Sequence, residues 1–571
     1  MRTLITVVVI VFFFVANPFG FKTATEEGSV IIFNKLFASF YPGANSAAPQ
    51  ATIGQDRIAV ALMTDRAAEA LAGGYPVPLA QHGRVIADIL CAGAKAVFVD
   101  LNFRWERIEG DAAEFYDLLR YRRTDDGCKQ LEPQALKSGA FAPVIIGHVR
   151  SHSSLCDPFE PSPESCKSQR GFAGLARLRD VAHIIDLPEP LSDLRYDLGI
   201  AAGHKPARPA ENAASMTEIV SPAWAMLRAL CAGDKKAKSC VTLSAPTPPN
   251  ESILTLRWGF DVSPRDRGIK DSLGGRCPGQ RAAETESGKV WNMRRPFGFG
   301  ESPPEGEGYC PYHDTMVASD IREAARIGNK IALKDLTGNQ VLRIYFNDRA
   351  VFYGIQIAGI GDEARSPTIG RLPGVYAHAM ALDNLITQGR RYWHDPPQFG
   401  WWNAAEWIDF LLSLLFIGIA WIVEEKNDEE FQEVALAKSD IEPFAILKWF
   451  WDFPHRCGNA LRCLARRQPV RRAQRVSTNP AIPAERERAY RNHNRRNWIV
   501  LGFGFLVVIS VTIVEMYWLS WPPNDWLVLA GVIVYAMPSH RKYDEWTGSK
   551  HPYYRRVVGF FGGQMKRKNS H

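Results

Sequence analysis

The sequence lacks the short motifs that mark the common enzyme classes. It contains no phosphate-binding Gly-Lys-Ser/Thr loop, no His-Glu-x-x-His pair of a metalloprotease and no Gly-x-Ser-x-Gly nucleophile elbow. Each of these motifs holds a reactive group, a metal or a phosphate in a fixed geometry. We therefore predict that the chain is not an enzyme, and we assign it no catalytic residue, no metal ligand and no cofactor.

The long middle of the chain lacks membrane-length apolar runs. Residues 22–400 contain none, although such runs lie on both sides. Before them, the apolar run Leu4–Ala16 predicts either an uncleaved anchor over residues 1–21 or a signal peptide. The poor cleavage site at Thr23-Ala24-Thr25 favours the anchor. In both cases we expect residues 22–400 to form one exported domain.

Cysteine is scarce outside that domain. Eight of the ten cysteines lie within residues 22–400, and an even number in an oxidising compartment favours disulfides. Connectivity does not follow from sequence. Neighbours along the chain suggest, as guesses, Cys156 with Cys166, Cys231 with Cys240, and Cys277 with Cys310. Cys91 lies on an apolar helical stretch, where a buried thiol is an equally good interpretation.

The exported domain opens with the pattern of a parallel βαβ unit. The apolar run Ile58–Met63 ends near Asp65, a loop rich in glycine and proline follows, and Val85–Leu90 repeats apolar residues at helical spacing. Ala96–Val99 is a second apolar run and ends at Asp100. Continuous apolar strands joined by a helix are typical of a buried parallel sheet.

This opening resembles that of a CHASE2 domain, an extracytoplasmic sensor domain of bacterial membrane receptors. The matching pieces are Val60–Asp65, Tyr75–Pro78 followed by His82, Ala92–Val97, and Val99–Asp100. The family usually has Trp where this chain has Tyr75 and Val77, and Arg where it has Leu79. A second patch, Leu372–Val375 followed by His378 and Ala379, resembles the closing segment of the family, so the resemblance covers roughly residues 30–390.

Further segments complete an α/β pattern. We expect strands at 141–147, 181–186, 252–260, 341–346 and 351–359, helices at 216–230 and after residue 375, and a loop-rich insertion at about 261–318. The predicted fold class is therefore α/β, with a mixed, partly parallel sheet in the exported domain.

Several polar residues lie where open α/β sheets bind ligands, beyond the carboxyl ends of strands. The candidates are Asp65, Asp100 and Asp362 at strand ends, with His82 and His378 near helix starts. Together they predict a pocket for a small ligand or a cation. Taken singly, each also fits a structural role, because Asp caps helices and His hydrogen-bonds the backbone.

The sequence changes character at Trp401. We predict transmembrane helices at 401–423, 498–518 and 524–538, the last one short, which with residues 1–21 make a four-helix transmembrane portion. The basic loop 424–497 and the basic tail 539–571 should face the cytoplasm, together with the N-terminus. The CHASE2 resemblance implies the same arrangement: a multi-pass protein of the bacterial inner membrane whose main domain is periplasmic.

The cytoplasmic loop is rich in arginine. Arg466, Arg467, Arg471, Arg472 and Arg475 are candidates for contact with the lipid membrane or with a partner. A nucleic-acid patch is the alternative interpretation, but the position beside the membrane favours lipid phosphate, and we predict no nucleic acid.

In the resembled family an output module such as a cyclase or kinase usually follows the last helix, whereas here only residues 539–571 follow. We therefore expect extracytoplasmic sensing of an unknown small-molecule or envelope signal, relayed to a separate cytoplasmic or membrane signalling partner. A homodimer is compatible with this function, although no residue shows it. The alternative is a non-sensing structural scaffold of an envelope complex.

Overall fold

The structure is a computed structural model that describes residues 21–38, 41, 54–101, 111–137, 143–148, 177–188, 194–199, 220–233, 253–259, 312–333, 336–357, 363–368, 370–399, 402–415, 418, 502–504 and 506–523. Its contacts divide the chain into two units. The sheet unit comprises Gly20–Glu406 and Thr512–Asp525, and the second unit comprises Met1–Phe19, Trp407–Val511 and Trp526–His571.

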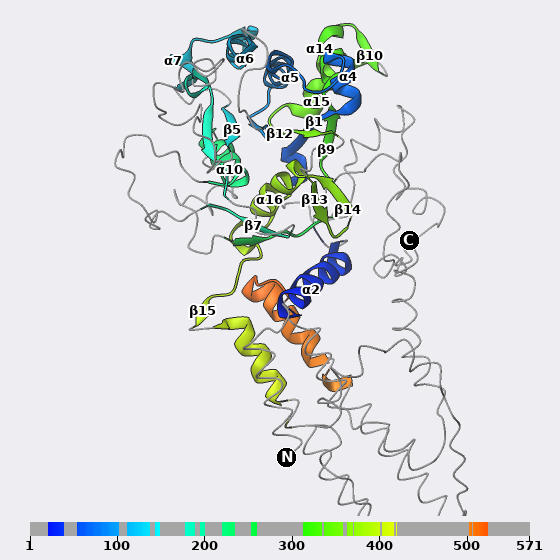
Figure 1. Cartoon of the computed structure of the whole chain (residues 1–571), viewed down its shortest axis with the longest axis vertical. Helices are drawn as coiled ribbons and strands as arrows, with labels where there is room; N and C mark the ends of the chain where they lie inside the picture. Colours follow the sequence, from blue (N-terminus) through cyan, green and yellow to red (C-terminus); the bar gives the residue numbers. More distant parts are fainter. Residues whose placement is uncertain are drawn as a thin grey trace, which may run out of the picture. The chain divides into compact units, whose positions relative to one another are not determined.

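A six-stranded sheet, parallel at every pairing, forms the centre of the sheet unit (Figure 1). Its spatial order is β6 (His183–Asp186), β5 (Val144–His148), β2 (Ala96–Val99), β12 (Ala350–Gln356), β1 (Ile58–Thr64) and β9 (Asp314–Val317). The strands predicted at 58–63, 96–99, 141–147, 181–186 and 351–359 correspond to β1, β2, β5, β6 and β12 and are confirmed over the bounds of these elements. Strand β12, the last of the six along the chain, lies between β1 and β2.

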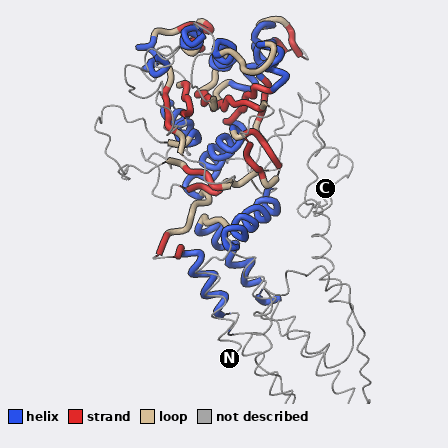
Figure 2. Tube along the Cα trace, in the orientation of Figure 1, coloured by secondary structure: helices blue, strands red, loops and turns tan. Residues whose placement is uncertain are grey.

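Helices cover both faces of the sheet, as continuous apolar strands require (Figure 2). Along β1, Ile58, Val60 and Leu62 enter one core, whereas Ala59, Ala61 and Met63 enter the other. The α16 face carries α10 (Pro222–Gly233) and α16 (Val375–Gln388). The α5 face carries α4 (Asp65–Ala72), α5 (Leu79–Cys91), α6 (Asp111–Leu118), α14 (Ala318–Ile327) and α15 (Gly338–Phe346).

The predicted strand at 341–346 is wrong, because these residues belong to helix α15. Thr337 Oγ1 accepts the backbone N–H of Gln340, and the side chain of Gln340 accepts the N–H of Thr337, so a capping box starts the helix. The apolar residues that looked alternating also fit helical spacing, with Val341, Leu342, Tyr345 and Phe346 buried. The capping box therefore favours the helical spacing over the alternating spacing of a strand.

Two predicted loops contain regular structure. Part of the loop after β1 is helix α4, which Thr64 caps by accepting the N–H of Ala67. The end of the predicted insertion 261–318 forms the edge strand β9 and starts α14. Asp314 of β9 forms a buried ion pair with Arg349, which ties this edge to the start of β12.

A hairpin of β3 (Tyr121–Thr124) and β4 (Gly127–Gln130) is attached to α5 by a disulfide between Cys91 and Cys128. Cys91 is therefore disulfide-bonded and not a free thiol. Cys231 is also disulfide-bonded. The proposed partners Cys156, Cys166, Cys240, Cys277 and Cys310 lie outside the described residues.

The remaining elements are short or lie at the periphery. They are α2 (Phe21–Phe37), α3 (Gly54–Arg57), α7 (Pro133–Lys137), β7 (Arg195–Asp197), β8 (Ile253–Thr255), β10 (Ile331–Leu333), β11 (Leu336–Thr337), β13 (Glu363–Ser366), β14 (Gly370–Pro373), β15 (Gln398–Phe399) and β16 (Trp402–Asn403), with 3₁₀ turns at Arg177–Asp180 and Gly389–Arg391. The predicted strand 252–260 is confirmed only over β8, which pairs antiparallel with β7.

Within the described residues, one helix is long and apolar enough to cross a membrane, Gly502–Leu519, where the sequence predicts a span at 498–518. Its last turn, Glu515–Leu519, is a π-helix. Residues 404–415 of the predicted span 401–423 are also helical, and Asn403 and Glu406 cap that helix reciprocally. Residues 1–20 and 524–538 lie outside the described residues, so the four-helix portion stays a prediction.

Candidate functional site

Asp100 and His378 lie together at the carboxyl edge of the sheet. Asp100 follows β2 directly, and His378 lies in the first turn of α16. His378 Nε2 is 3.7 Å from Asp100 Oδ2, and the two side chains are 21% and 16% exposed. This distance is too long for a direct hydrogen bond but allows attraction as an ion pair when His378 is protonated.

Tyr196 of β7 orients the imidazole of His378. Its hydroxyl oxygen lies 2.8 Å from Nδ1 of His378 and accepts the backbone N–H of Ala223 at 3.3 Å. The hydroxyl hydrogen is thus available to Nδ1, and in the tautomer that accepts it the imidazole hydrogen lies on Nε2, the nitrogen that faces Asp100. Burial raises the pKa of Tyr196, so this hydroxyl stays protonated.

The environment of Asp100 favours its neutral form. Burial raises the pKa of Asp100 from 3.8 to about 6. A carboxyl group with such a pKa changes its charge just below neutral pH, and groups with perturbed pKa values gather at functional sites. The Asp100–His378 pair can therefore hold a proton, or accept and donate hydrogen bonds to a bound molecule.

The structure places the other candidates elsewhere. His82 is buried on the α5 face, where its Nδ1 lies 2.6 Å from the hydroxyl of Tyr353. Asp65 is exposed at the first position of α4. Asp362 lies outside the described residues, as do Arg466, Arg467, Arg471, Arg472 and Arg475. The structure therefore brings together two of the five candidates at the sheet edge.

A buried polar network further along α16 was missed from the sequence. Asp383 Oδ1 accepts the hydroxyls of Tyr41 at 2.6 Å and Thr387 at 3.1 Å, and Asp383 Oδ2 lies 3.2 Å from His313 Nε2. Asp383 and His313 are almost completely buried. The signal was present, because Asp383 and Asn384 interrupt an apolar helix, and buried polar side chains need internal partners.

Asn384, the next residue, binds the backbone of Arg257. Its Oδ1 accepts the N–H of Arg257 at 3.1 Å, and its Nδ2 donates to the carbonyl of Arg257 at 2.9 Å. Asn34 of α2 donates to the carbonyl of Leu256 at 3.2 Å and accepts the N–H of Trp258 at 3.0 Å. Two asparagines thus hold one extended segment between α16 and α2.

The same segment also contacts the part of the chain that follows α16. The guanidinium of Arg257 lies 4.6 Å from the ring of Trp393 and 5.7 Å from that of Tyr41. Trp393 Nε1 donates to the carbonyl of Met516 at 3.3 Å, and the N–H of His394 donates to the carbonyl of Ser520 at 3.0 Å. A chain of contacts therefore runs from α16 to the end of the apolar helix Gly502–Leu519.

The part of the chain that the structure describes contains no group of three His, Cys, Asp or Glu side chains arranged to bind a metal ion. The Asp100–His378–Tyr196 arrangement instead offers one carboxyl group, one imidazole and one phenol, with the imidazole and the phenol hydrogen-bonded to each other. Such a set suits recognition of a polar organic group or a change in protonation.

The CHASE2 domain family model matches residues 7–422. This range covers more than half of the chain, and the chain belongs to the CHASE2 domain family. This match confirms the resemblance found in the sequence. CHASE2 domains are extracytoplasmic sensor domains. No curated protein and no solved structure gives a significant match to the chain.

Proposed function

We propose that this chain is a multi-pass sensor of the bacterial inner membrane. In this proposal the periplasmic sheet unit detects a small-molecule or envelope signal at the Asp100–His378 pair. The resulting change passes through α16 to the transmembrane helices and then to a separate cytoplasmic or membrane partner. The proposal includes neither an enzymatic activity nor nucleic-acid binding.

The observation that carries this proposal is the position of α16. Its first turn bears His378 at the sheet edge, and its middle bears Asp383 and Asn384, which bind segments near α2 and near residue 393. A helix moves as a rigid rod over a few turns, so a displacement at His378 also displaces Asn384. Helix α2 begins where the predicted anchor ends, and Trp393 contacts the end of the apolar helix Gly502–Leu519.

Exposed apolar side chains support membrane integration. Trp407, Leu411 and Leu415 recur at four-residue spacing along one helix face and are 42%, 59% and 53% exposed. Phe503, Leu506 and Ile513 are exposed in the same way on the helix Gly502–Leu519. Large apolar faces open to the surroundings suit contact with lipid chains. The proposed spans are 1–21, 401–423, 498–518 and 524–538.

The arginine-rich loop is the proposed cytoplasmic contact. By the positive-inside rule, loop 424–497 and both termini face the cytoplasm, where Arg466, Arg467 and Arg471 can bind lipid phosphate or an acidic partner surface. Docking of the partner would then depend on the positions of the helices on either side of the loop.

A thermal-shift screen tests the sensing step. The full chain, purified in detergent, is heated with a panel of metabolites and divalent cations, and a ligand that binds the folded state raises the melting temperature. We expect a hit whose shift is lost in Asp100→Asn and in His378→Gln. Asp65→Asn is the matched control, because Asp65 is exposed, and it should retain the shift. A shift that survives both site substitutions would refute the assignment of this site.

The scaffold alternative also has an observation in its favour. The ring of His378 packs edge-on against Phe98 and Tyr196, with centroid distances of 5.5 Å in both cases. Side chains therefore occupy part of the space at the sheet edge. If a folded chain shows no shift with any compound of a broad panel, the scaffold becomes the better proposal.

A further inference from the structure

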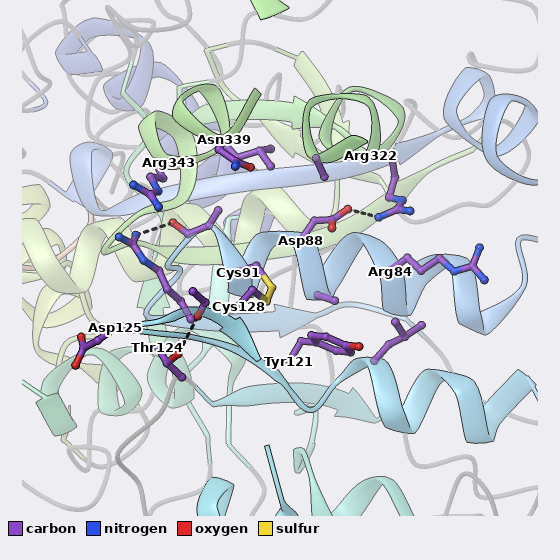
Figure 3. A pocket seen from close by; sticks show the side chains of 17 residues that line it. Arg84, Asp88, Cys91, Tyr121, Thr124, Asp125, Cys128, Arg322, Asn339 and Arg343 are labelled. Atoms are coloured by element: carbon purple, nitrogen blue, oxygen red, sulfur yellow. Dashed lines mark hydrogen bonds and ion pairs between the residues drawn. A yellow bond between two sulfur atoms is a disulfide. The ribbon is translucent and has the colours of Figure 1, made fainter. Parts of the chain in front are cut away.

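A cavity lies on the α5 face, on the other side of the sheet from His378. It has a volume of about 620 Å³ and opens between α5, the β3–β4 hairpin, α14 and α15 (Figure 3). Arg343, Asn339 and Arg322 line one side, Asp125, Thr124 and Tyr121 line the other, and the Cys91–Cys128 disulfide lies between them. Cavities of this volume hold small molecules.

The lining of this cavity is basic. Four arginines contribute to it, Arg84, Arg123, Arg322 and Arg343, against two carboxylates, Asp88 and Asp125. Arg322 pairs with Asp88, and Arg84 pairs with Glu114, a residue outside the lining. Among the described residues, no acidic side chain pairs with Arg123 or Arg343. Arg123 and Arg343 thus carry positive charge without a paired acid, against one further carboxylate in the lining, that of Asp125.

Neutral groups hold Arg123 in place. Its Nη1 donates to Asn347 Oδ1 at 2.8 Å and to the carbonyl of Ala92 at 3.5 Å. Gly93, whose φ is +100°, makes room for this arrangement. A Cβ atom on Gly93 would lie 2.9 Å from Arg123 Nη1 and 2.5 Å from Asn347 Oδ1. Neutral acceptors therefore orient the guanidinium in advance, and no described acidic side chain pairs with it.

The disulfide holds the wall that carries Arg123. It joins Cys91, at the end of α5, to Cys128 of β4, and both cysteines line the cavity. Arg123 of β3 lies directly opposite Cys128 of β4 in the register of the antiparallel hairpin. Because the hairpin is attached to α5 in this way, the spacing between Arg123 and the helical side of the cavity is restrained.

We propose that this cavity binds a small organic or inorganic anion with at least two oxyanion groups, carboxylate or phosphate, clamped between Arg123 and Arg343. Guanidinium groups bind such oxygens through paired, charge-assisted hydrogen bonds. Asn339, Tyr121 and Thr124 supply further polar groups at the wall. The site is separate from the Asp100–His378 pair, and it stands or falls independently of the sensing proposal.

The test measures binding to the full chain in detergent by calorimetry and by thermal shift. The probes are citrate for the carboxylate source and pyrophosphate for the phosphate source, with sodium chloride at matched ionic strength as the blank. The variants are Arg343→Gln, Arg123→Gln and the double substitution. Arg326→Gln is the control, because Arg326 lies on α14 outside the cavity and pairs with Glu323.

We expect at least one probe to bind the parent chain and Arg326→Gln equally. Each cavity substitution should weaken that binding by about tenfold or more, as the loss of one charge-assisted contact does. The probe that binds identifies the source of the oxyanion. Arg343→Gln keeps the test valid if Arg123→Gln disturbs the hairpin, since Arg343 has no side-chain partner among the described residues.

Two results would overturn the proposal. One is binding of neither citrate nor pyrophosphate beyond the salt blank. The other is equal binding by the parent chain and the double variant, which would assign the anion to another basic surface. Because Asp100→Asn leaves this cavity intact, that variant should bind the probe like the parent chain and so separates this site from the sensing site.

Discussion

At the scale of single residues, Asp100 is largely buried, and its carboxyl group has the imidazole of His378 as a near neighbour. Water normally stabilises a carboxylate, and its removal disfavours the charged form. The imidazole of His378 lies 3.7 Å away and is charged only when it is protonated. The result is a group whose protonation couples to folding and, under the sensing proposal, to ligand binding at the edge of the sheet.

This coupling predicts a pH-dependent stability. Because the folded-state pKa of Asp100 is about 6 and its ordinary value 3.8, its contribution is full below pH 3.8 and is lost as the pH rises through 6. Asp100→Asn removes the buried charge, so at pH 7.5 we expect it to be more stable than the parent, by up to about 3 kcal/mol.

Melting temperatures of the full chain between pH 4 and pH 8 measure this effect. The difference between Asp100→Asn and the parent should shrink toward pH 4, where both side chains are neutral. Asp65→Asn is measured beside it as a substitution at an exposed position. Parallel curves for Asp100→Asn and the parent would contradict the raised pKa.

At the scale of elements, the apolar pattern alone did not distinguish a helix from a strand, and local capping and contacts between distant residues made the distinction. Residues 341–346 fit an alternating strand and also a helix, and the Thr337–Gln340 capping box selects the helix. The apolar side of α15 then covers the α5 face of the sheet. The same helix carries Arg343 to the basic cavity.

The capping box therefore makes a testable contribution to stability. Thr337→Ala removes the oxygen that accepts the N–H of Gln340, and we expect a loss of about 1 kcal/mol in the free energy of unfolding. Thr337→Ser keeps that oxygen and should remain close to the parent. Denaturant titration of the full chain distinguishes the two variants. Equal destabilisation by both would show that the methyl group, and not the cap, matters.

At the scale of the whole molecule, the sensing proposal requires a connection between the sheet unit and the arginine-rich loop 424–497. Trp393→Phe tests it, because this substitution removes the indole N–H that binds the carbonyl of Met516 but keeps an aromatic ring near Arg257. We expect the ligand found by thermal shift to bind this variant as tightly as it binds the parent.

The readout of this connection is trypsin cleavage at Arg466, Arg467 and Arg471. The proposed topology makes the loop accessible in inverted membrane vesicles, and ligand loaded inside the vesicles should change the cleavage rate in the parent chain. The change should be reduced in Trp393→Phe. Cleavage only in vesicles of the opposite orientation would refute the predicted topology, and an undiminished response in Trp393→Phe would place the relay elsewhere.

The sequence determined the central architecture because burial on both faces leaves a direct trace in it. Continuous apolar runs such as Ile58–Met63 and Ala96–Val99 cannot face water on either side, so a parallel sheet between helices follows. Family membership followed from the same segments. Asp100 and His378 were recognised as candidates because the carboxyl ends of parallel strands collect ligand-binding residues.

The tertiary structure alone decided which of these residues meet. Strand β12 lies between β1 and β2, and α16 covers one face of the sheet. This placement alone brings His378 close to Asp100, whereas His82 contacts Tyr353 on the opposite face of the sheet. Tyr196, the Asp383 network and the Cys91–Cys128 disulfide depend on contacts between residues far apart in the chain. Such contacts leave no local pattern, because any of several partners would satisfy the same buried group.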